Sequence, residues 1–393
     1  MTKIFVTAYA ETPVSRARVD KGEKKLTIEQ YYAWALNMVL EQTGLSLSDF
    51  RGIGVGVTGS AYPRAEIWSA EVVQNLGLEP RLLLRGDHGG ANGAALLVAG
   101  ALAIQAGYVD HFLILGADTP MNITGEAALT WRYELDYLMP VGMMGPNSMA
   151  AMMMQRQIHQ YGYKPEHYGK ISVSQRENAS KNPNAYFRTP LKMEEYLNSP
   201  LISDPLRMLD ICPFVNGGFA LLLSRDTVAK KVTDKLVKVA GFGSWHNLDA
   251  SNSLKDITTT GVKNAVKQAL EMSGIKLKDI GLFNAYDDYT PVVIMQLEDA
   301  GFCEKGKAGK FLEETDITYR GELPLNTGGG LLSYGQAGMA GGMHHLVEAV
   351  RQQRGEAGER QVKDLRYSLV TSVGALEHGG TFINNYAIIF GGE

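Results

Sequence analysis

The chain has 393 residues, of which 45% are hydrophobic and 20% are charged. Such a composition is typical of a globular protein with a large core and excludes a disordered chain. The formal net charge of −4 provides no basic surplus for binding nucleic acid or an anionic membrane, so we expect small molecules and proteins as partners.

The first residues, MTKIFVTAYAETP, predict a short strand and a turn and lack the pattern of a secretory signal. No apolar run reaches the roughly 20 residues that a membrane-spanning helix requires. Two cysteines, Cys212 and Cys303, are too few for a disulfide framework or a multi-cysteine metal site. We therefore expect a cytoplasmic protein without a metal.

A repeated unit is the most informative pattern in the chain. Segments 31–55 and 261–285 each predict a helix that ends at a glycine, a short connection and an apolar strand. Many helix–glycine–strand units look alike, but these two share five identities at one constant offset (270 − 40 = 230), which favours an internal duplication. The matches are Leu40, Glu41, Gly44, Leu47 and Asp49 with Leu270, Glu271, Gly274, Leu277 and Asp279.

A second pair of similar segments follows the two copies, at 89–118 and 335–374. Each opens with small residues, continues as a predicted helix and ends in an apolar strand. The N-terminus of a close-packed helix presents free N–H groups and positive partial charge, which favour anions and enolate oxygens. Two such termini in a duplicated fold are expected to converge on one site.

The duplication predicts two halves, residues 1–225 and 226–393, with an inserted loop region at about 119–206. Seven of the sixteen methionines lie in this region, between Met139 and Met154. Methionine adapts to irregular apolar space. The segment is therefore expected either to line a pocket for a bulky apolar group or to pack against the core or a second subunit.

Several stretches resemble the thiolase superfamily, and the match spans nearly the whole chain. VTAYAETPVSR is similar to the first strand and turn of the lipid-transfer-protein-type thiolases. DPLRMLDICPFVNGGFALLL resembles the segment that ends the first half, and GELPLNTGGGLLSYGQAG resembles the second-half signature. The resemblance implies an internally duplicated α/β thiolase fold with five layers in the order α-β-α-β-α.

The sequence departs from the family at the positions that carry its chemistry. When GDHGGANGAALL is aligned with the segment of the nucleophilic cysteine, Gly89 takes the cysteine position. Glycine has no side chain and cannot form an acyl-enzyme. In YDDYT, Tyr286 replaces the catalytic histidine or asparagine, and YGQAGMAG lacks the family's second histidine and begins with Tyr334.

The remaining candidates fall into two groups. Cys212 and Cys303 match no thiolase cysteine position and are expected to be structural. His88 immediately precedes Gly89 and is expected to reach the site. His378 matches the family's late glycine loop, where it would orient substrate while the backbone of Gly380 supplies an oxyanion donor.

This combination of losses and gains resembles the thiolase-like aldolases that cleave CoA thioesters in bacterial steroid side-chain degradation. The resemblance implies a catalytic tyrosine at Tyr286 and a second at Tyr334, with Tyr289 as the alternative to the first. Retro-aldol cleavage needs a base, an acid and stabilisation of an enolate but no covalent intermediate. A site built from helix N-termini is expected to favour a tyrosine phenolate.

The predicted function is therefore retro-aldol cleavage of a bulky β-hydroxyacyl-CoA to a ketone or aldehyde and a short acyl-CoA. The alternatives are a β-ketoacyl-CoA thiolase or acyltransferase with atypical residues, and a non-catalytic acyl-CoA-binding subunit. Coenzyme A is expected as part of the substrate, without a covalently bound cofactor. The resemblance also implies a homodimer and a small zinc-ribbon and OB-fold partner protein.

Overall fold

The computed structural model describes residues 2–16, 25–56, 58–59, 67–122, 139–143, 145–246, 256–377 and 381–392. Within these residues, nine strands form one mixed sheet in the order β3-β2-β4-β7-β1-β8-β11-β10-β9. The first half contributes β1 (Ile4–Glu11), β2 (Gly52–Gly56), β3 (Leu82–Gly86), β4 (His111–Asp118) and β7 (Gly217–Arg225). The second half contributes β8 (Val237–His246), β9 (Ile280–Ala285), β10 (Tyr367–Glu377) and β11 (Thr381–Gly391).

The two halves of the sheet repeat the same pairing. In the first half, β2 runs parallel to β3 and β4, and β7 is antiparallel to β4 and β1. In the second half, β9 runs parallel to β10, and β11 is antiparallel to β10 and β8. A parallel bridge from Phe283 to Leu325 takes the place of β3. β1 and β8 join the halves through two residue pairs.

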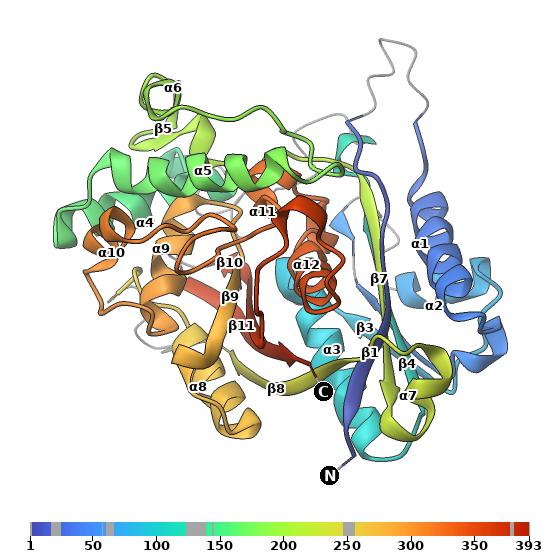
Figure 1. The fold of residues 1–393 in the computed structure, drawn as a ribbon. Coiled ribbons are helices and arrows are strands. Elements are labelled where there is room, and N and C mark those ends of the chain that lie inside the picture. Colours follow the sequence, from blue (N-terminus) through green and yellow to red (C-terminus); the bar gives the residue numbers. More distant parts are fainter. Residues whose placement is uncertain are drawn as a thin grey trace.

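Helices lie between and outside the two halves of the sheet (Figure 1). The central pair is α3 (Asn92–Gln105) and α12 (Met343–Gln353). The outer helices are α1 (Ile28–Thr43) and α2 (Trp68–Asn75) on one side and α8 (Val262–Ser273) and α9 (Thr290–Asp299) on the other. Shorter helices are α7 (Asp226–Val232), α10 (Ala308–Glu314) and α11 (Gly330–Tyr334). α3 is rich in apolar residues, which suits a helix with sheet on both sides.

The repeated unit has the same local structure in both copies. α1 and α8 each end at a glycine in the left-handed conformation, Gly44 and Gly274, with φ of 65° and 72°. A short 3-10 turn follows each helix, and in each turn an aspartate accepts a hydrogen bond from a backbone N–H, Asp49 at 2.8 Å and Asp279 at 2.9 Å. The strands β2 and β9 come next. The duplicated sequence therefore encodes a duplicated structure.

The described part of the inserted region forms α4 (Gly145–Tyr161), α5 (Pro165–Ser180), α6 (Met193–Leu197) and the hairpin of β5 (Leu201–Ser203) and β6 (Leu206–Arg207). Met153 and Met154 of α4 are buried in a core cluster with residues of α9. These two methionines therefore pack against the core, which is one of the two predicted alternatives. Met152, on the same helix, is 43% exposed.

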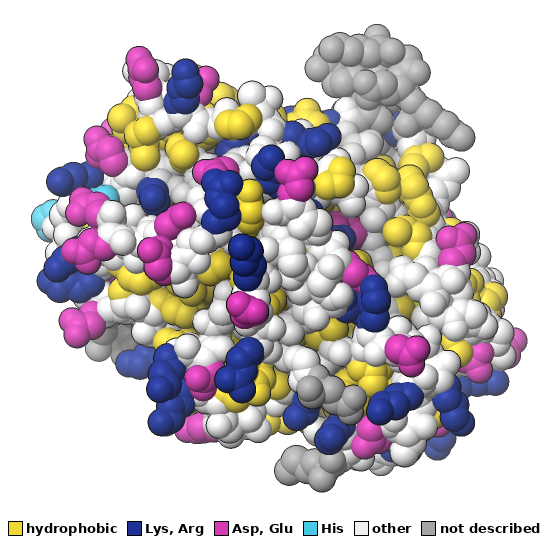
Figure 2. All heavy atoms as spheres, viewed as in Figure 1, with side chains coloured by type: hydrophobic (Ala, Val, Ile, Leu, Met, Phe, Trp, Pro, Cys, Tyr) yellow, Lys and Arg dark blue, Asp and Glu magenta, His cyan; other side chains and the backbone are white. Residues whose placement is uncertain are grey.

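Among the residues that the structure describes, none of the helices combines the length and the apolar character that crossing a membrane demands. On the face shown in Figure 2, lysine and arginine side chains alternate with aspartate and glutamate. This mixed distribution accords with the small net charge of the chain.

Candidate active site

The N-termini of the two central helices meet at Tyr286. Gly90 lies in the 3-10 turn that leads into α3, and Gly342 is the residue before α12. A Cβ on Gly342 would overlap the carbonyl oxygen of Gly90 and lie 3.2 Å from the Tyr286 ring. The expected convergence of the two helix N-termini is thus present in the structure, and the Tyr286 side chain lies where they approach each other.

The Tyr286 hydroxyl lies directly over Gly90. A Cβ on Gly90 would overlap the hydroxyl oxygen, so a residue with a side chain would displace the phenol. Gly89, the position of the thiolase cysteine, is the adjacent residue and has φ of 58°. A Cβ there would lie 2.9 Å from the backbone nitrogen of Ala375. The tyrosine hydroxyl therefore stands next to the position at which the family places its nucleophile.

Hydrogen bonds fix both ends of Tyr286. Its backbone N–H donates to the Thr371 carbonyl at 3.1 Å, and its carbonyl accepts from the Gln296 side chain at 2.6 Å. Its hydroxyl oxygen accepts from Gln336 Nε2 at 2.6 Å. Among the described residues, the hydrogen bond from Gln336 is the one found at this hydroxyl, and it does not use the hydroxyl proton.

Burial raises the pKa of Tyr286 well above its ordinary value, and the nearby charge of Asp288 raises it further. The hydrogen bond from Gln336 acts in the opposite direction but does not outweigh burial. The expectation that helix N-termini favour a phenolate is therefore wrong for this residue, because desolvation penalises the charged form. At neutral pH, Tyr286 is a neutral hydrogen-bond donor.

One loop joins the groups around Tyr286. Cys212 donates its backbone N–H to the carbonyl of Asp288 at 3.0 Å. Further along the same loop, the Pro213 carbonyl accepts from the Gln336 N–H at 2.8 Å, and the Val215 N–H donates to the Gln336 carbonyl at 3.0 Å. Burial, followed by the charges of Asp288 and the preceding aspartate, raises the pKa of the Cys212 thiol well above its ordinary value. A thiol that holds its proton is a poor nucleophile.

His88 is adjacent to Gly89 but is tied to the second half of the sheet. Its Nδ1 lies 3.2 Å from Asn384 Oδ1 and 3.3 Å from the Tyr386 hydroxyl, both on β11. His246, the last residue of β8, contacts the same two groups at 2.9 and 3.4 Å. His88 therefore belongs to a polar cluster on the flank of the Gly89 turn.

Tyr334, two residues before Gln336, has surroundings that differ from those of Tyr286. Its ring stacks on His344 with 3.7 Å between the centroids. Its hydroxyl is buried beside Glu11 without a well-formed hydrogen bond, and burial followed by the Glu11 charge raises its pKa well above the ordinary value. The structure brings Tyr286, Gly89 and His88 into one region, whereas the Tyr334 hydroxyl faces Glu11. His378 and Gly380 lie outside the described residues.

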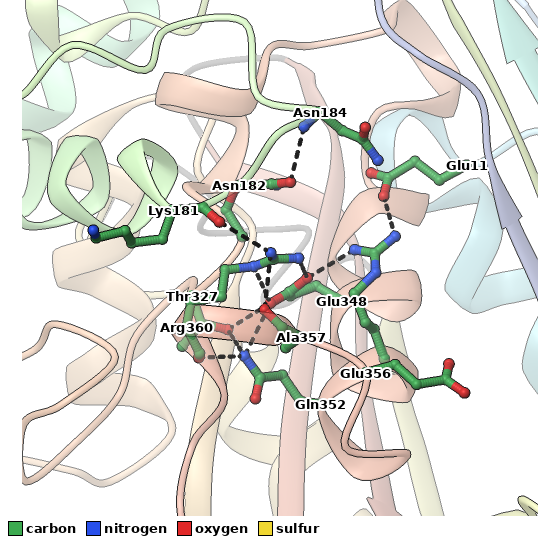
Figure 3. Close-up of polar contacts among 12 residues, drawn as sticks. Glu11, Lys181, Asn182, Asn184, Thr327, Glu348, Gln352, Glu356, Ala357 and Arg360 are labelled. Carbon is green, nitrogen blue, oxygen red and sulfur yellow. Dashed lines mark hydrogen bonds and ion pairs between the residues drawn. The ribbon is translucent and has the colours of Figure 1, made fainter.

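The Tyr334 hydroxyl adjoins a buried ionic network, of which Figure 3 labels Glu11, Glu348 and Arg360. Glu11 on β1 lies 2.7 Å from His344 and is paired with Arg351. Glu348 on α12 is paired with Arg351 at 2.8 Å and Arg360 at 2.9 Å. Burial alone raises the pKa of Glu348, but Arg360 and Arg351 outweigh it and hold the pKa at about 2. These charges link β1 of the first half to α12 of the second.

Two residues near Tyr286 were not singled out from the sequence. Gln336 follows Gly335 and takes the histidine position if YGQAG is aligned through that glycine. Asp288 stands within the YDDYT motif, two residues after Tyr286. The motif signals were therefore present, but the hydrogen bond to Gln336 and the burial of Asp288 depend on tertiary contacts. Among the described residues, no group of three or more histidine, cysteine, aspartate or glutamate side chains is arranged to hold a metal ion.

Comparison with known proteins identifies the superfamily. The family model "Thiolase C-terminal domain-like" matches residues 243–391. The chain is 30% identical over 345 residues to an acetyl-CoA acetyltransferase of Methanothermobacter thermautotrophicus, over 87% of this chain and 89% of the relative. It is also 30% identical over 375 residues to a steroid side-chain-cleaving aldolase of Thermomonospora curvata, and the match covers 91% of this chain and 92% of that relative. The chain therefore belongs to the thiolase superfamily.

Solved structures show the same relationship. The Ltp2–ChsH2(DUF35) aldolase matches with a TM-score of 0.82 and 26% identity, over 99% of this chain and 97% of that chain. The human mitochondrial 3-ketoacyl-CoA thiolase shares the fold, with a TM-score of 0.72 at 16% identity over 99% and 98% of the two chains. The predicted thiolase fold is confirmed. The named relatives include both aldolases and acyltransferases, so the chain is a member of an enzyme superfamily with two kinds of carbon–carbon chemistry.

Proposed function

We propose that the protein is a CoA-thioester lyase that cleaves a bulky β-hydroxyacyl-CoA by a retro-aldol reaction into a ketone or aldehyde and a short acyl-CoA. The position of the Tyr286 hydroxyl carries this proposal. It lies over Gly90 at the start of α3, next to Gly89, which cannot act as a nucleophile. The arrangement supplies a proton donor where a thiolase forms its covalent intermediate.

The chemistry of the site supports a non-covalent reaction. An enolate oxygen at the paired helix N-termini would be stabilised by backbone N–H groups and their positive partial charge. Tyr286 keeps its proton and is oriented by Gln336, so it is suited to donate to the enolate. We assign His88 and the Gly89 backbone to substrate positioning. His378 and the Gly380 backbone stay predictions for the same role, and Tyr334 stays a prediction as a second catalytic tyrosine.

The test is a product assay with a panel of β-hydroxyacyl-CoA and β-ketoacyl-CoA esters. The chain is incubated alone and with the small OB-fold protein proposed as its partner, in the presence and absence of free CoA. Release of a ketone or aldehyde from the β-hydroxy esters without consumption of CoA is the expected result. CoA-dependent cleavage of the β-keto esters alone would contradict the lyase.

A β-ketoacyl-CoA thiolase or acyltransferase is the second candidate, because the half-buried thiol of Cys212 lies on the loop beside Tyr286 and Asp288. Such an enzyme would form an acyl-enzyme on this cysteine. Mass spectrometry after incubation with acyl-CoA distinguishes the two, since the lyase leaves Cys212 unmodified. Tight acyl-CoA binding without turnover, even with the partner, would instead indicate a non-catalytic subunit.

We also propose a homodimer and a small zinc-ribbon and OB-fold partner. β3 is an edge strand of the sheet, and its residues Leu82, Leu83 and Leu84 are only half-buried. An edge strand of this kind is suited to pairing with a second copy of the chain. Leu201 and Ile202 of the inserted hairpin are 52% and 49% exposed and provide an apolar surface for a partner. Light scattering of the chain with and without the OB-fold protein tests both. A cytoplasmic location is part of the same proposal.

A further inference from the structure

Two neighbouring aspartates in the YDDYT motif have opposite surroundings. Asp287 accepts a hydrogen bond from the Leu331 N–H at 2.8 Å, and its Oδ1 lies 2.9 Å from His345 Nε2. Asp288 has a buried Oδ1 without a hydrogen-bond partner among the described residues, and no lysine, arginine or histidine of the described chain is paired with it. A buried, unpartnered carboxylate oxygen is costly and needs an explanation. Asp287 anchors α11, whereas the Asp288 carboxyl interacts only with the backbone N–H groups of Tyr289 and of Asp288 itself among the described residues, which leaves Oδ1 without a partner.

The contacts of Asp288 place it at the Tyr286 site. Its backbone carbonyl accepts from Cys212, and its charge acts on Tyr286, Cys212 and Tyr289. Tyr286 and Tyr289 are 3% and 5% exposed, whereas Asp288 and Cys212 are half-buried. The cluster is thus accessible from the side of Asp288 and Cys212, where a substrate would meet the carboxyl group.

The titration order of the cluster follows from these surroundings. Burial, and then the adjacent Asp287 charge, raises the pKa of Asp288 to about 8, while the backbone N–H of Tyr289 acts in the opposite direction. The titratable groups facing it are Asp287, Tyr286 and Tyr289 from its own loop and Cys212 from the loop before β7. Burial leaves the pKa of both tyrosines higher still. The carboxyl therefore loses its proton while Tyr286 keeps its own.

We propose that Asp288 is the general base that removes the β-hydroxyl proton of the substrate, with Tyr286 as the acid on the same loop. This assignment rests on the proposed lyase function. Two groups whose environments separate their proton affinities are suited to divide the roles of base and acid.

The proton balance closes without a co-reactant. Asp288 takes the hydroxyl proton, the O–H electrons form the new carbonyl bond, and the electrons of the broken Cα–Cβ bond pass into the thioester enolate. Tyr286 gives its proton to Cα, which yields the short acyl-CoA. Asp288 then returns the first proton to the tyrosine, so both residues regain their initial states.

The experiment measures kcat/KM against pH for the chain with its partner, on whichever β-hydroxyacyl-CoA of the panel is cleaved. Because the carboxylate is the active form, activity of the wild type should rise as pH increases through about 8. Asp288→Asn should lower kcat/KM by about 10²- to 10³-fold and abolish that rise. Asp288→Glu, which retains a carboxyl, should keep part of the activity and the rise. Asp234→Asn, at an exposed position, is the matched control and should behave as wild type.

Infrared difference spectroscopy measures the protonation of the Asp288 carboxyl directly. It does not depend on turnover, and it can be carried out on the wild type even if a variant fails to fold. A protonated-carboxyl band in the wild type should disappear as pH rises through about 8 and be missing in Asp288→Asn but not in Asp234→Asn. Lyase turnover of Asp288→Asn with the wild-type rate and pH profile would overturn the base while leaving the lyase intact. Absence of wild-type turnover on every β-hydroxy ester would overturn both.

Discussion

Two buried polar clusters, each with residues from both halves of the chain, differ in whether their carboxylates are paired with cations. In the ionic network of Glu11, His344, Glu348, Arg351 and Arg360, each carboxylate is paired with at least one cation. In the cluster of Tyr286, Asp288, Tyr289 and Cys212, the aspartate has no cationic partner among the described residues. The pKa of Glu348 is held at about 2 in the first, and that of Asp288 rises to about 8 in the second.

This difference in pairing suits one cluster to stabilising the fold and the other to transferring protons. Paired buried charges tie β1 to α12 and keep one protonation state over the physiological range. An unpaired carboxyl changes its protonation near neutral pH, as a general base must. Each cluster contains or adjoins a tyrosine that the sequence predicts to be catalytic: Tyr286 lies near the unpaired carboxyl of Asp288, and Tyr334 lies near the paired carboxylate of Glu11.

The largest expected effect is on the paired cluster. Glu348→Gln leaves Arg351 and Arg360 buried without their shared carboxylate and should lower the free energy of unfolding by about 3–5 kcal/mol. Urea denaturation measures the change. Glu271→Gln, which breaks an exposed pair with Lys267 on α8, is the control and should cost less than about 0.5 kcal/mol. Equal stabilities of the two variants would show that the network does not hold the halves together.

Tyr286→Phe should have the next largest effect, and this effect is chiefly on turnover. Loss of the proton donor should reduce lyase kcat by about 10²- to 10³-fold, because general acid catalysis contributes on that order. Steady-state kinetics measure the loss, and the free energy of unfolding should fall by only about 1–3 kcal/mol, because Gln336 Nε2 loses its acceptor. The exposed Tyr108→Phe is the control. Unchanged lyase turnover of Tyr286→Phe would remove the main support for the proposed function.

The two clusters should give stability opposite dependences on pH. The folded-state pKa of Glu348 lies below its ordinary value of 4.5, so its contribution is present above pH 4.5 and is lost as pH falls toward 2. The raised pKa of Asp288 means that the folded state holds a proton that the unfolded state releases above pH 3.8, so stability falls as pH rises toward 8.

Asp288→Asn should remove the second of these losses. Its free energy of unfolding at pH 9 should exceed that of the wild type by about 1–3 kcal/mol, the usual cost of a buried polar group without a partner. Urea denaturation at pH 5 and pH 9 measures the difference, and Asp234→Asn should show no gain. A gain of the same size at both pH values would assign the effect to packing and not to ionisation.

The smallest effect is expected for Tyr334→Phe. Its hydroxyl lies beside Glu11 without a well-formed hydrogen bond, so the variant should change stability by less than about 1 kcal/mol. Kinetics and denaturation of the same preparation test this. A loss of turnover as large as that of Tyr286→Phe in a stable variant would establish Tyr334 as the second catalytic tyrosine.

Local sequence predicted much of the fold. The periodicity and terminal glycines of 31–55 and 261–285 predict two helix–turn–strand units, and both copies form them. The glycine at position 89 excludes a nucleophilic side chain without any knowledge of the structure. The motif around Tyr286 likewise identified the residue that lies between the two helix N-termini. These inferences succeeded because backbone conformation and residue type are local properties.

Only the tertiary structure decided the proton chemistry of the site. Neither the direction of the Tyr334 hydroxyl toward Glu11 nor the cluster of His88 with His246 and Tyr386 can be read from segments so far apart in the chain. The same holds for the two adjacent aspartates of one motif: Asp287 accepts a hydrogen bond from Leu331, whereas Oδ1 of Asp288 has no hydrogen-bond partner in the described part of the chain. Sequence determined the duplicated fold and the missing nucleophile, whereas long-range packing determined which groups are desolvated and therefore which can exchange a proton.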